Sequence, residues 1–305
     1  MQLKTENKRV SLGIPKFSIG GYTDNNLNSG MTIISCDRPN VTGIYQTGGS
    51  PATRETDVLR SNHRMDYSVD DLVFTGRSVY GFNNLPIIMR WESEHNHGVK
   101  IGDAIVPIIP SAAIYDFHDG IKIPKDDWAQ RAIDALGGEL PLGKEWCGTG
   151  ATVGKIKGMQ YAKPSGQGYS LISKGELKVG VYVVANSLGE VFDLNGNCLS
   201  TLNINLESLF NSVIHEDNII NIDSERSLNT TVGTAITNAA LTHQQASYIA
   251  EAANFGLASR IYPYSTGFDG DTVFAVSTNE VQYPVDEVAY LARIAAEQAI
   301  MSIFK

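Results

Sequence analysis

The 305-residue sequence has few cysteines and no long apolar run, and each shortage excludes a class of protein. Cys36, Cys147 and Cys198 lie far apart without zinc-site spacing, so we expect reduced thiols rather than disulfides or a metal centre. No stretch approaches the roughly 18 to 20 uncharged apolar residues of a membrane helix. The charged start, MQLKTENKRVSLGIPKF, lacks the apolar segment of a secretory signal. We therefore expect a cytoplasmic protein with no membrane partner.

Positive charge is also scarce. The 24 basic residues face 33 acidic ones, the formal net charge is −9, and no Lys/Arg stripe is present. We therefore expect neither a nucleic acid nor an anionic membrane surface as a partner. With 42% hydrophobic residues the chain can bury a sizeable core, although composition does not decide between one large domain and two.

Short β-branched or apolar runs alternate with amphipathic segments. Continuous apolar strands need cover on both faces, and amphipathic helices can supply it, so the pattern predicts a layered α/β architecture. Thr242 and Gln245 have the spacing of a capping box, and Pro284 stands at a helix entrance. The predicted strands are 31–35, 72–74, 104–109, 179–185, 231–237 and 272–277, and the predicted helices are 126–138, 242–259 and 284–304.

The stretch SERSLNTTVGTAITN, residues 224–238, joins a polar run to a predicted strand. The segment before it is rich in Asn, Asp, Glu and Ser, and its part near 215–229 is predicted to be an exposed connection. In isolation, Asn229-Thr230-Thr231 most often forms a turn that enters a strand. Its N-x-T pattern does not predict glycosylation, because no secretory signal is present.

A chemical interpretation of the same stretch is that Thr230 becomes a chain N-terminus. A threonine hydroxyl is a weak nucleophile until a base removes its proton. An α-amino group, with a pKa of roughly 7.7 to 8, is such a base near physiological pH. Cleavage of the Asn229–Thr230 bond would therefore create nucleophile and base on one residue. Thr230 itself could make the cut, by attack on the preceding carbonyl and hydrolysis of the resulting ester.

Two further segments contain charged side chains that could serve this nucleophile. In GFDGDTVFAVST (267–278), Asp269 and Asp271 either form a turn or orient an ammonium group; one DxD has too few ligands for calcium. WCGTGATVGKIKG (146–158) does not match a phosphate loop. Its Lys155 is either an ordinary surface lysine or a buried ammonium beside the nucleophile.

Two polar side chains could also stabilise an oxyanion. Asn186 ends a predicted strand, as a turn residue or as an amide donor worth about 3 kcal/mol. Tyr115 is in isolation a packing aromatic with a satisfied hydroxyl. The six histidines, including His95 and His97, show no triad or HExxH arrangement, and we expect them at the surface.

Several blocks in the sequence match one family in order. NTTVGTAITNAALTHQQ followed by YSTGFDGDTVFAVST resembles the C-terminal region of the self-cleaving amidohydrolases of peptidase family S58. These include D-aminopeptidase/L-amino-acid amidases, β-peptidyl aminopeptidases and the nylon-oligomer hydrolase. GGSPATRETDVL (48–59), LVFTGRSVYGF (72–82) and PSAAIYDF (110–117) are similar to its N-terminal blocks. The resemblance covers about residues 17 to 300.

The resemblance implies a single domain with a four-layer αββα fold, made as a precursor that cleaves itself. Residues 1–229 would form the larger subunit and residues 230–305 the smaller, in a homo-oligomer, with a tetramer expected, and without metal or cofactor. The implied roles are nucleophile for Thr230, oxyanion stabilisation for Asn186 and Tyr115, positive charge for Lys155, and binding of the new N-terminus for Asp269 and Asp271.

The site residues also imply a substrate class. Thr230 together with the DGD block is similar to the nylon-oligomer hydrolase, which implies linear ω-amino-acid amides such as 6-aminohexanoate oligomers. An aminopeptidase acting on N-terminal D-, L- or β-amino acids, and a non-processing homologue that only binds its ligands, stay open as alternatives. Arg77 stands where the family pattern has a second glycine, and a guanidinium there could alter the pocket.

Overall fold

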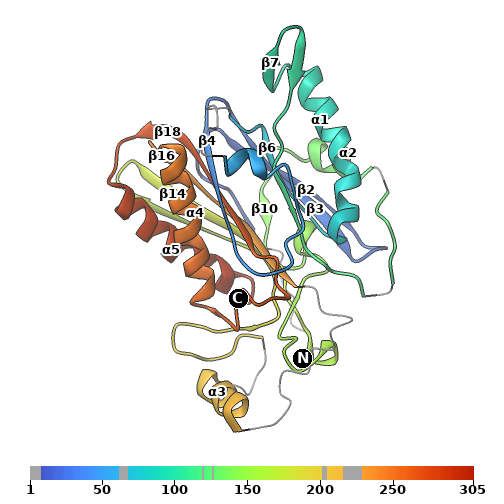
Figure 1. The fold of residues 1–305 in the computed structure, drawn as a ribbon, viewed down its shortest axis with the longest axis vertical. Helices are drawn as coiled ribbons and strands as arrows, with labels where there is room; N and C mark the ends of the chain where they lie inside the picture. The colour runs from blue at the N-terminus through green and yellow to red at the C-terminus, as the bar shows by residue number, and fades with distance from the viewer. Residues whose placement is uncertain (1–7, 62–67, 119, 126, 201–204, 216–228) are drawn as a thin grey trace.

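Two five-stranded sheets lie face to face, and helices cover the outer face of each (Figure 1). This arrangement is seen in a computed structural model that describes residues 8–61, 68–118, 120–125, 127–200, 205–215 and 229–305. The order of layers is α4 and α5, the first sheet, the second sheet, and α1 with α2. The predicted αββα fold is confirmed.

The first sheet, called sheet I, carries both strands next to the predicted cleavage point. Its order is β13-β14-β16-β18-β4, and only β16 and β18 run parallel. The α4 helix connects these two strands, and α5 follows β18. The bounds are β13 Gln167–Lys174, β14 Leu177–Asn186, β16 Thr230–Ala239, β18 Thr272–Val281, β4 Val41–Gln46, α4 His243–Ala258 and α5 Val285–Ser302.

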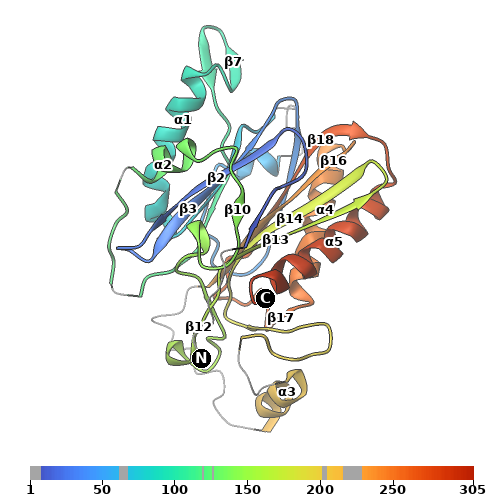
Figure 2. The ribbon, with the colours of Figure 1, turned by 180° about the vertical axis from the view of Figure 1, so that it is seen from behind.

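The second sheet, sheet II, has the order β2-β3-β6-β9-β5. Figure 2 shows β2 and β3 facing the β13 and β14 side of sheet I. The bounds are β2 Phe17–Asp24, β3 Ser29–Cys36, β6 Asp71–Thr75, β9 Ser111–Ala113, β5 Thr53–Arg54, α1 Leu85–Glu94 and α2 Trp128–Asp134. Shorter elements are β1 Arg9–Val10, β7 Val99–Ile101, β8 Ala104–Val106, β10 Leu140–Pro141, β11 Thr152–Val153, β12 Lys163–Pro164, β15 Glu190–Val191, α3 Leu206–His215 and β17 Ile261–Tyr262.

Alternation along the central strands accounts for the layers. On β14, Val181 and Val183 pack in the cluster under α4 and α5, whereas Tyr182 and Val184 pack between the sheets. Side chains alternate faces along a strand, so an apolar run without polar positions needs cover on both sides. A third apolar cluster lies between sheet II and its helices, around Trp128.

Most predicted elements are present. Five of the six predicted strands lie within β3, β6, β14, β16 and β18, and the three predicted helices contain α2, α4 and α5. Thr242 caps α4 with Gln245 in a capping box, as predicted. The α1 and α3 helices were not predicted. Among the described residues no helix has both the length and the apolarity to span a bilayer.

The predicted strand 104–109 is wrong beyond its first half. Only Ala104–Val106 is a strand, and it pairs with β7 in a hairpin whose Ile101 and Val106 are 61% and 41% exposed. Pro107 and Pro110 flank the apolar pair that follows. Proline lacks the N–H that a central strand donates to its ladder, so this apolar run cannot extend a sheet interior.

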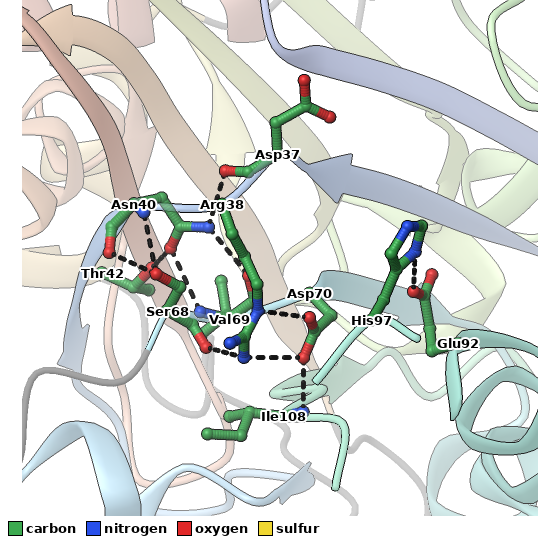
Figure 3. Close-up of polar contacts among 10 residues, drawn as sticks. All are labelled: Asp37, Arg38, Asn40, Thr42, Ser68, Val69, Asp70, Glu92, His97 and Ile108. Atoms are coloured by element: carbon green, nitrogen blue, oxygen red, sulfur yellow. Dashed lines mark hydrogen bonds and ion pairs between the residues drawn. The ribbon is translucent and has the colours of Figure 1, made fainter. Parts of the chain in front are cut away.

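A polar cluster holds the start of β6 (Figure 3). Asp70, 3% exposed, accepts Arg38 Nε at 2.6 Å and the Ile108 backbone N–H at 2.8 Å. Nearby, His97 Nδ1 lies 2.7 Å from Glu92 Oε2. These contacts tie the start of β6 to the segment after β3 and to the residues before β9. Asp70 precedes β6, whereas Arg77 follows it. The five residues of the strand therefore separate the polar cluster from Arg77 by about 17 Å.

Candidate active site

The predicted site residues meet where three strands of sheet I begin or end. Asn186, the last residue of β14, pairs directly with Thr230, the first residue of antiparallel β16. Asp271 immediately precedes β18, which runs parallel to β16. Thr230 shares its strand face with Val232, which packs between the sheets. The topology therefore brings residues from distant parts of the chain to one edge of the sheet.

The predicted scissile bond is buried and clamped. Asn229 and Thr230 are 0% and 3% exposed. The Asn229 N–H donates to the Phe268 carbonyl, and the Gly270 N–H donates to the Asn229 carbonyl, both at 2.9 Å. The Thr230 hydroxyl contacts that same Asn229 carbonyl oxygen. The Asn229 carbonyl oxygen therefore accepts from both the Thr230 hydroxyl and the Gly270 N–H, and these donors polarise the carbonyl.

The exposed connection predicted near 215–229 lies mostly outside the described residues. Its last residue, Asn229, is buried and extends the parallel pairing of β16 and β18 through a bridge to Asp269. For this residue the prediction of exposure is wrong, because a backbone that joins a ladder is drawn into the sheet.

Two buried carboxyl groups lie beside the bond. Asp271 accepts the Thr231 N–H at 2.6 Å and the Ser265 N–H at 3.2 Å. Asp269 accepts the Thr266 hydroxyl at 2.6 Å. Burial, and next the charge of Asp269, raise the pKa of Asp271 well above its ordinary value. A cation that appeared next to Thr231 would relieve this repulsion.

Lys155 is buried, with 3% exposure, against the strand partner of Thr230. Its Nζ donates to both the carbonyl and the side-chain Oδ1 of Asn186, each at 3.0 Å. Burial lowers the pKa of Lys155 to about 7, although Asp269 and Asp116 act in the opposite direction. The Lys155 side chain can therefore change between its charged ammonium form and its neutral amine form near neutral pH.

The amide of Asn186 is oriented from both sides. Its Oδ1 accepts from Lys155 and from the Thr152 N–H at 3.0 Å, and its Nδ2 donates to the Tyr115 carbonyl at 2.9 Å. An amide nitrogen has two hydrogens, and within the described part of the chain the second one has no acceptor, so it can meet a ligand oxygen. Tyr115 joins the site through its main chain, and its ring packs edge-on against Phe117 with centroids 5.0 Å apart.

Arg77 is fully buried and has a left-handed backbone, with φ +61°. Glycine adopts this conformation without strain, whereas a residue with a Cβ meets a steric cost there. The guanidinium donates to the Leu27 carbonyl and lies 5.0 Å from the Phe117 ring centroid. The Arg77 side chain therefore contacts the β2–β3 turn and the aromatic residue beyond Tyr115.

Two contributors were not identified from the sequence. One is the Gly270 N–H, a main-chain group that no side-chain pattern reveals. The other is Asp116, a buried carboxyl group next to Tyr115 that accepts the Ser29 hydroxyl at 2.6 Å. Its only signal was an acidic residue inside the apolar block PSAAIYDF.

The remaining titratable candidates lie elsewhere. His95 and His97 are exposed, as predicted. Cys36, Cys147 and Cys198 are free thiols, and burial raises the pKa of the first two well above the ordinary value. In the parts of the chain that the structure describes, no group of three or more His, Cys, Asp or Glu side chains is arranged to hold a metal ion.

The αββα fold and the family relationship together define a hydrolase that acts on amides or peptides. The chain belongs to peptidase family S58, whose family model matches residues 10–305. The family resemblance of the sequence blocks is therefore confirmed.

Two of the relatives carry names that refer to different activities. An uncharacterized aminopeptidase of Mycobacterium tuberculosis is 33% identical over 264 residues, covering 84% of this chain and 75% of the relative. The 6-aminohexanoate-oligomer endohydrolase of an Agromyces strain is 26% identical over 193 residues, covering 61% of this chain and 54% of the relative.

Solved structures share the architecture. A β-aminopeptidase from a Burkholderia species superposes with a TM-score of 0.70 at 16% identity, over 97% of this chain and 87% of the other. The L-aminopeptidase D-Ala-esterase/amidase of Ochrobactrum anthropi, described as a variant of the Ntn hydrolase fold, gives 0.70 at 16% identity, over 96% and 84%. These likenesses establish the fold.

Proposed function

We propose that the chain is an amide hydrolase that activates itself by cleaving the Asn229–Thr230 bond. The observation that carries the proposal is the contact of the Thr230 hydroxyl with the Asn229 carbonyl, which the Gly270 N–H holds at 2.9 Å. Denaturing mass spectrometry of the purified protein tests it. Two fragments, 1–229 and 230–305, are expected, and an intact chain after prolonged incubation would refute self-cleavage.

The cleavage step follows from these contacts. Thr230 Oγ attacks the carbonyl carbon of Asn229, and the Gly270 N–H stabilises the oxyanion. The carbon–nitrogen bond breaks, and the proton from Oγ ends on the departing nitrogen, which becomes the α-amine of Thr230. Water then hydrolyses the ester, which leaves a carboxylate on Asn229 and restores the hydroxyl.

Hydrolysis of a substrate amide repeats this chemistry with a new base. The α-amine of Thr230 takes the proton from Oγ as it attacks, and then gives it to the leaving amine. The second hydrogen of Asn186 Nδ2 stabilises the oxyanion, and Tyr115 supports this role through its main-chain carbonyl, which holds the amide. Lys155 supplies positive charge, and Asp269 with Asp271 binds the new N-terminus. Water hydrolyses the acyl ester and frees the enzyme.

We propose linear ω-amino-acid amides, such as 6-aminohexanoate oligomers, as the substrate class. The nucleophile and the DGD block support this class, as does the likeness to the Agromyces endohydrolase. An aminopeptidase activity is the second candidate, because the mycobacterial relative that is an uncharacterized aminopeptidase is more similar, at 33% identity. We further expect the processed protomers to form a homotetramer, which light scattering after size-exclusion chromatography would measure.

Blocking the amine of the substrate separates the two candidates. If the enzyme cleaves within oligomers, N-acetylated and free 6-aminohexanoate trimers should be hydrolysed at rates within about threefold of each other. An aminopeptidase binds the free ammonium, and a lost charged contact of roughly 1.5 to 3 kcal/mol would reduce the rate by at least tenfold. Chromatography of the products with both trimers gives the answer, and a strong loss on acetylation would favour the aminopeptidase.

A further inference from the structure

The carboxyl group of Asp116 lies in a cradle built around it. Asp116 is 1% exposed; its Oδ2 accepts the Ser29 hydroxyl at 2.6 Å, and its Oδ1 accepts the Arg77 N–H at 2.7 Å. A Cβ added at Gly76 or Gly150 would come within 2.5 or 2.6 Å of Oδ2. The start of β3, the turn after β6 and the loop before β11 therefore leave room for a carboxyl group and no more.

This carboxyl group is connected to the candidate site through its neighbour. The carbonyl of Tyr115 accepts Asn186 Nδ2 at 2.9 Å, and Asn186 Oδ1 accepts Lys155 Nζ at 3.0 Å. Fixing Asp116 therefore fixes the peptide that holds the amide, and the amide in turn holds the lysine. A neutral amide could still occupy the cradle, because its oxygen can accept the Arg77 N–H while its NH2 group donates to the Ser29 hydroxyl.

The charge of Asp116 also acts on Lys155, which the hydrogen bonds through Tyr115 and Asn186 connect to it. The negative groups that act on Lys155 are Asp269 and Asp116, and burial opposes both. The groups that face Asp116 are the Ser29 hydroxyl, Arg77, His118 and Lys155, with the Cys147 thiol also within electrostatic range. Burial raises the pKa of Asp116, and Ser29 and Arg77 act against that rise.

We propose that Asp116 is a positioning residue of the active site, which orients the Tyr115 peptide for Asn186 and supplies negative charge to the buried ammonium of Lys155. The role in hydrolysis rests on the proposed function, whereas the effect on Lys155 does not. Removing the negative charge of Asp116 removes one of the two groups that counteract the effect of burial on the Lys155 pKa. Lys155 should then lose its proton at lower pH, since its neutral form is favoured further.

A titration of Lys155 tests this without requiring turnover. Full-length chains carrying Thr230→Ala, labelled with 13C at lysine Cε, would be titrated by NMR, and Lys155→Met would assign the resonance. We expect a midpoint near pH 7 for Lys155, lower by roughly one unit when Asp116→Asn is added. Asp70→Asn, which neutralises a similarly buried carboxylate at the far end of β6, should leave the midpoint unchanged. An equal midpoint in the Asp116→Asn protein would overturn the proposal.

Activity gives a second readout in the processed enzymes. In Asp116→Asn, the alkaline decline of 6-aminohexanoate trimer hydrolysis should shift to lower pH by the same amount as the Lys155 midpoint. Asp70→Asn should alter only Tm. A change in Tm without a shift of the pH profile would mean that Asp116 is merely structural. If Asp116→Asn does not fold, Ser29→Ala replaces it: without the 2.6 Å hydrogen bond Asp116 retains its proton to higher pH, so the Lys155 midpoint should again fall. Failure of the parent chain to yield fragments beginning at Thr230 would refute self-cleavage and leave the titration result intact.

Discussion

The Thr230→Ala protein should purify as one uncut chain of 33.1 kDa and should hydrolyse no amide substrate. Alanine has no hydroxyl to attack the Asn229 carbonyl, and without cleavage the α-amine that serves as base is never released. Loss of an essential nucleophile typically lowers kcat by about 10⁴-fold or more. Intact-mass spectrometry and a hydrolysis assay on the same preparation would measure both effects.

Two matched variants show whether Thr230 itself is responsible. Thr230→Ser keeps the hydroxyl and should still yield a fragment beginning at residue 230. Thr231→Ala changes the next residue: it removes a hydroxyl that also acts on Asp271 but keeps the N–H that donates to Asp271. It should also be cut. A processed and active Thr230→Ala chain would mean that another residue is the nucleophile.

The long elements of the fold could be predicted because the local pattern of apolar residues indicates which of their faces are buried. The β14 run VGVYVVA has no polar position, and in the structure it is covered on both faces. The α4 helix has a capping box in its first turn. The strand prediction for 104–109 was wrong because a strand inside a sheet needs backbone N–H groups for its hydrogen bonds, and proline lacks this group.

The candidate site could be assembled from the sequence only in part. Thr230, Asp269 and Asp271 follow from blocks that adjoin two strands, and strand ends place their residues at a sheet edge. The contact between Lys155 and Asn186 depends on a loop that folds back on β14, which no local pattern encodes. The Gly270 N–H is invisible in principle, because every residue other than proline carries the same group.

Arg77 shows that the contacts of a side chain cannot be predicted from its residue type alone. The sequence suggested that a guanidinium in place of glycine could alter the pocket, whereas the structure places it on Leu27 and Phe117. A side chain at a left-handed position is directed by the turn, so residue type alone does not tell which neighbours it reaches. The same turn presents the Arg77 N–H to Asp116.

Replacing Lys155 should have the second largest effect on hydrolysis. In Lys155→Met the processed enzyme should lose about 100-fold in kcat, because one fixed charge or donor beside a developing oxyanion is typically worth about that much. Lys155→Arg keeps a positive charge at every accessible pH and should retain more activity. Lys157→Met, two residues along the same loop and only partly buried, is the matched control and should be nearly unaffected.

The pH profile identifies the role of the charge. Hydrolysis should rise as the α-amine of Thr230 loses its proton, with an ordinary pKa of roughly 7.7 to 8. It should fall as Lys155 becomes neutral above its pKa of about 7. Because the two groups act in opposite protonation states, the unmodified enzyme should show a narrow maximum near neutral pH. Lys155→Arg should remove the alkaline decline while keeping the acid limb. If the decline persists in Lys155→Arg, the charge on Lys155 does not control the reaction, and the lysine acts only by holding the amide of Asn186.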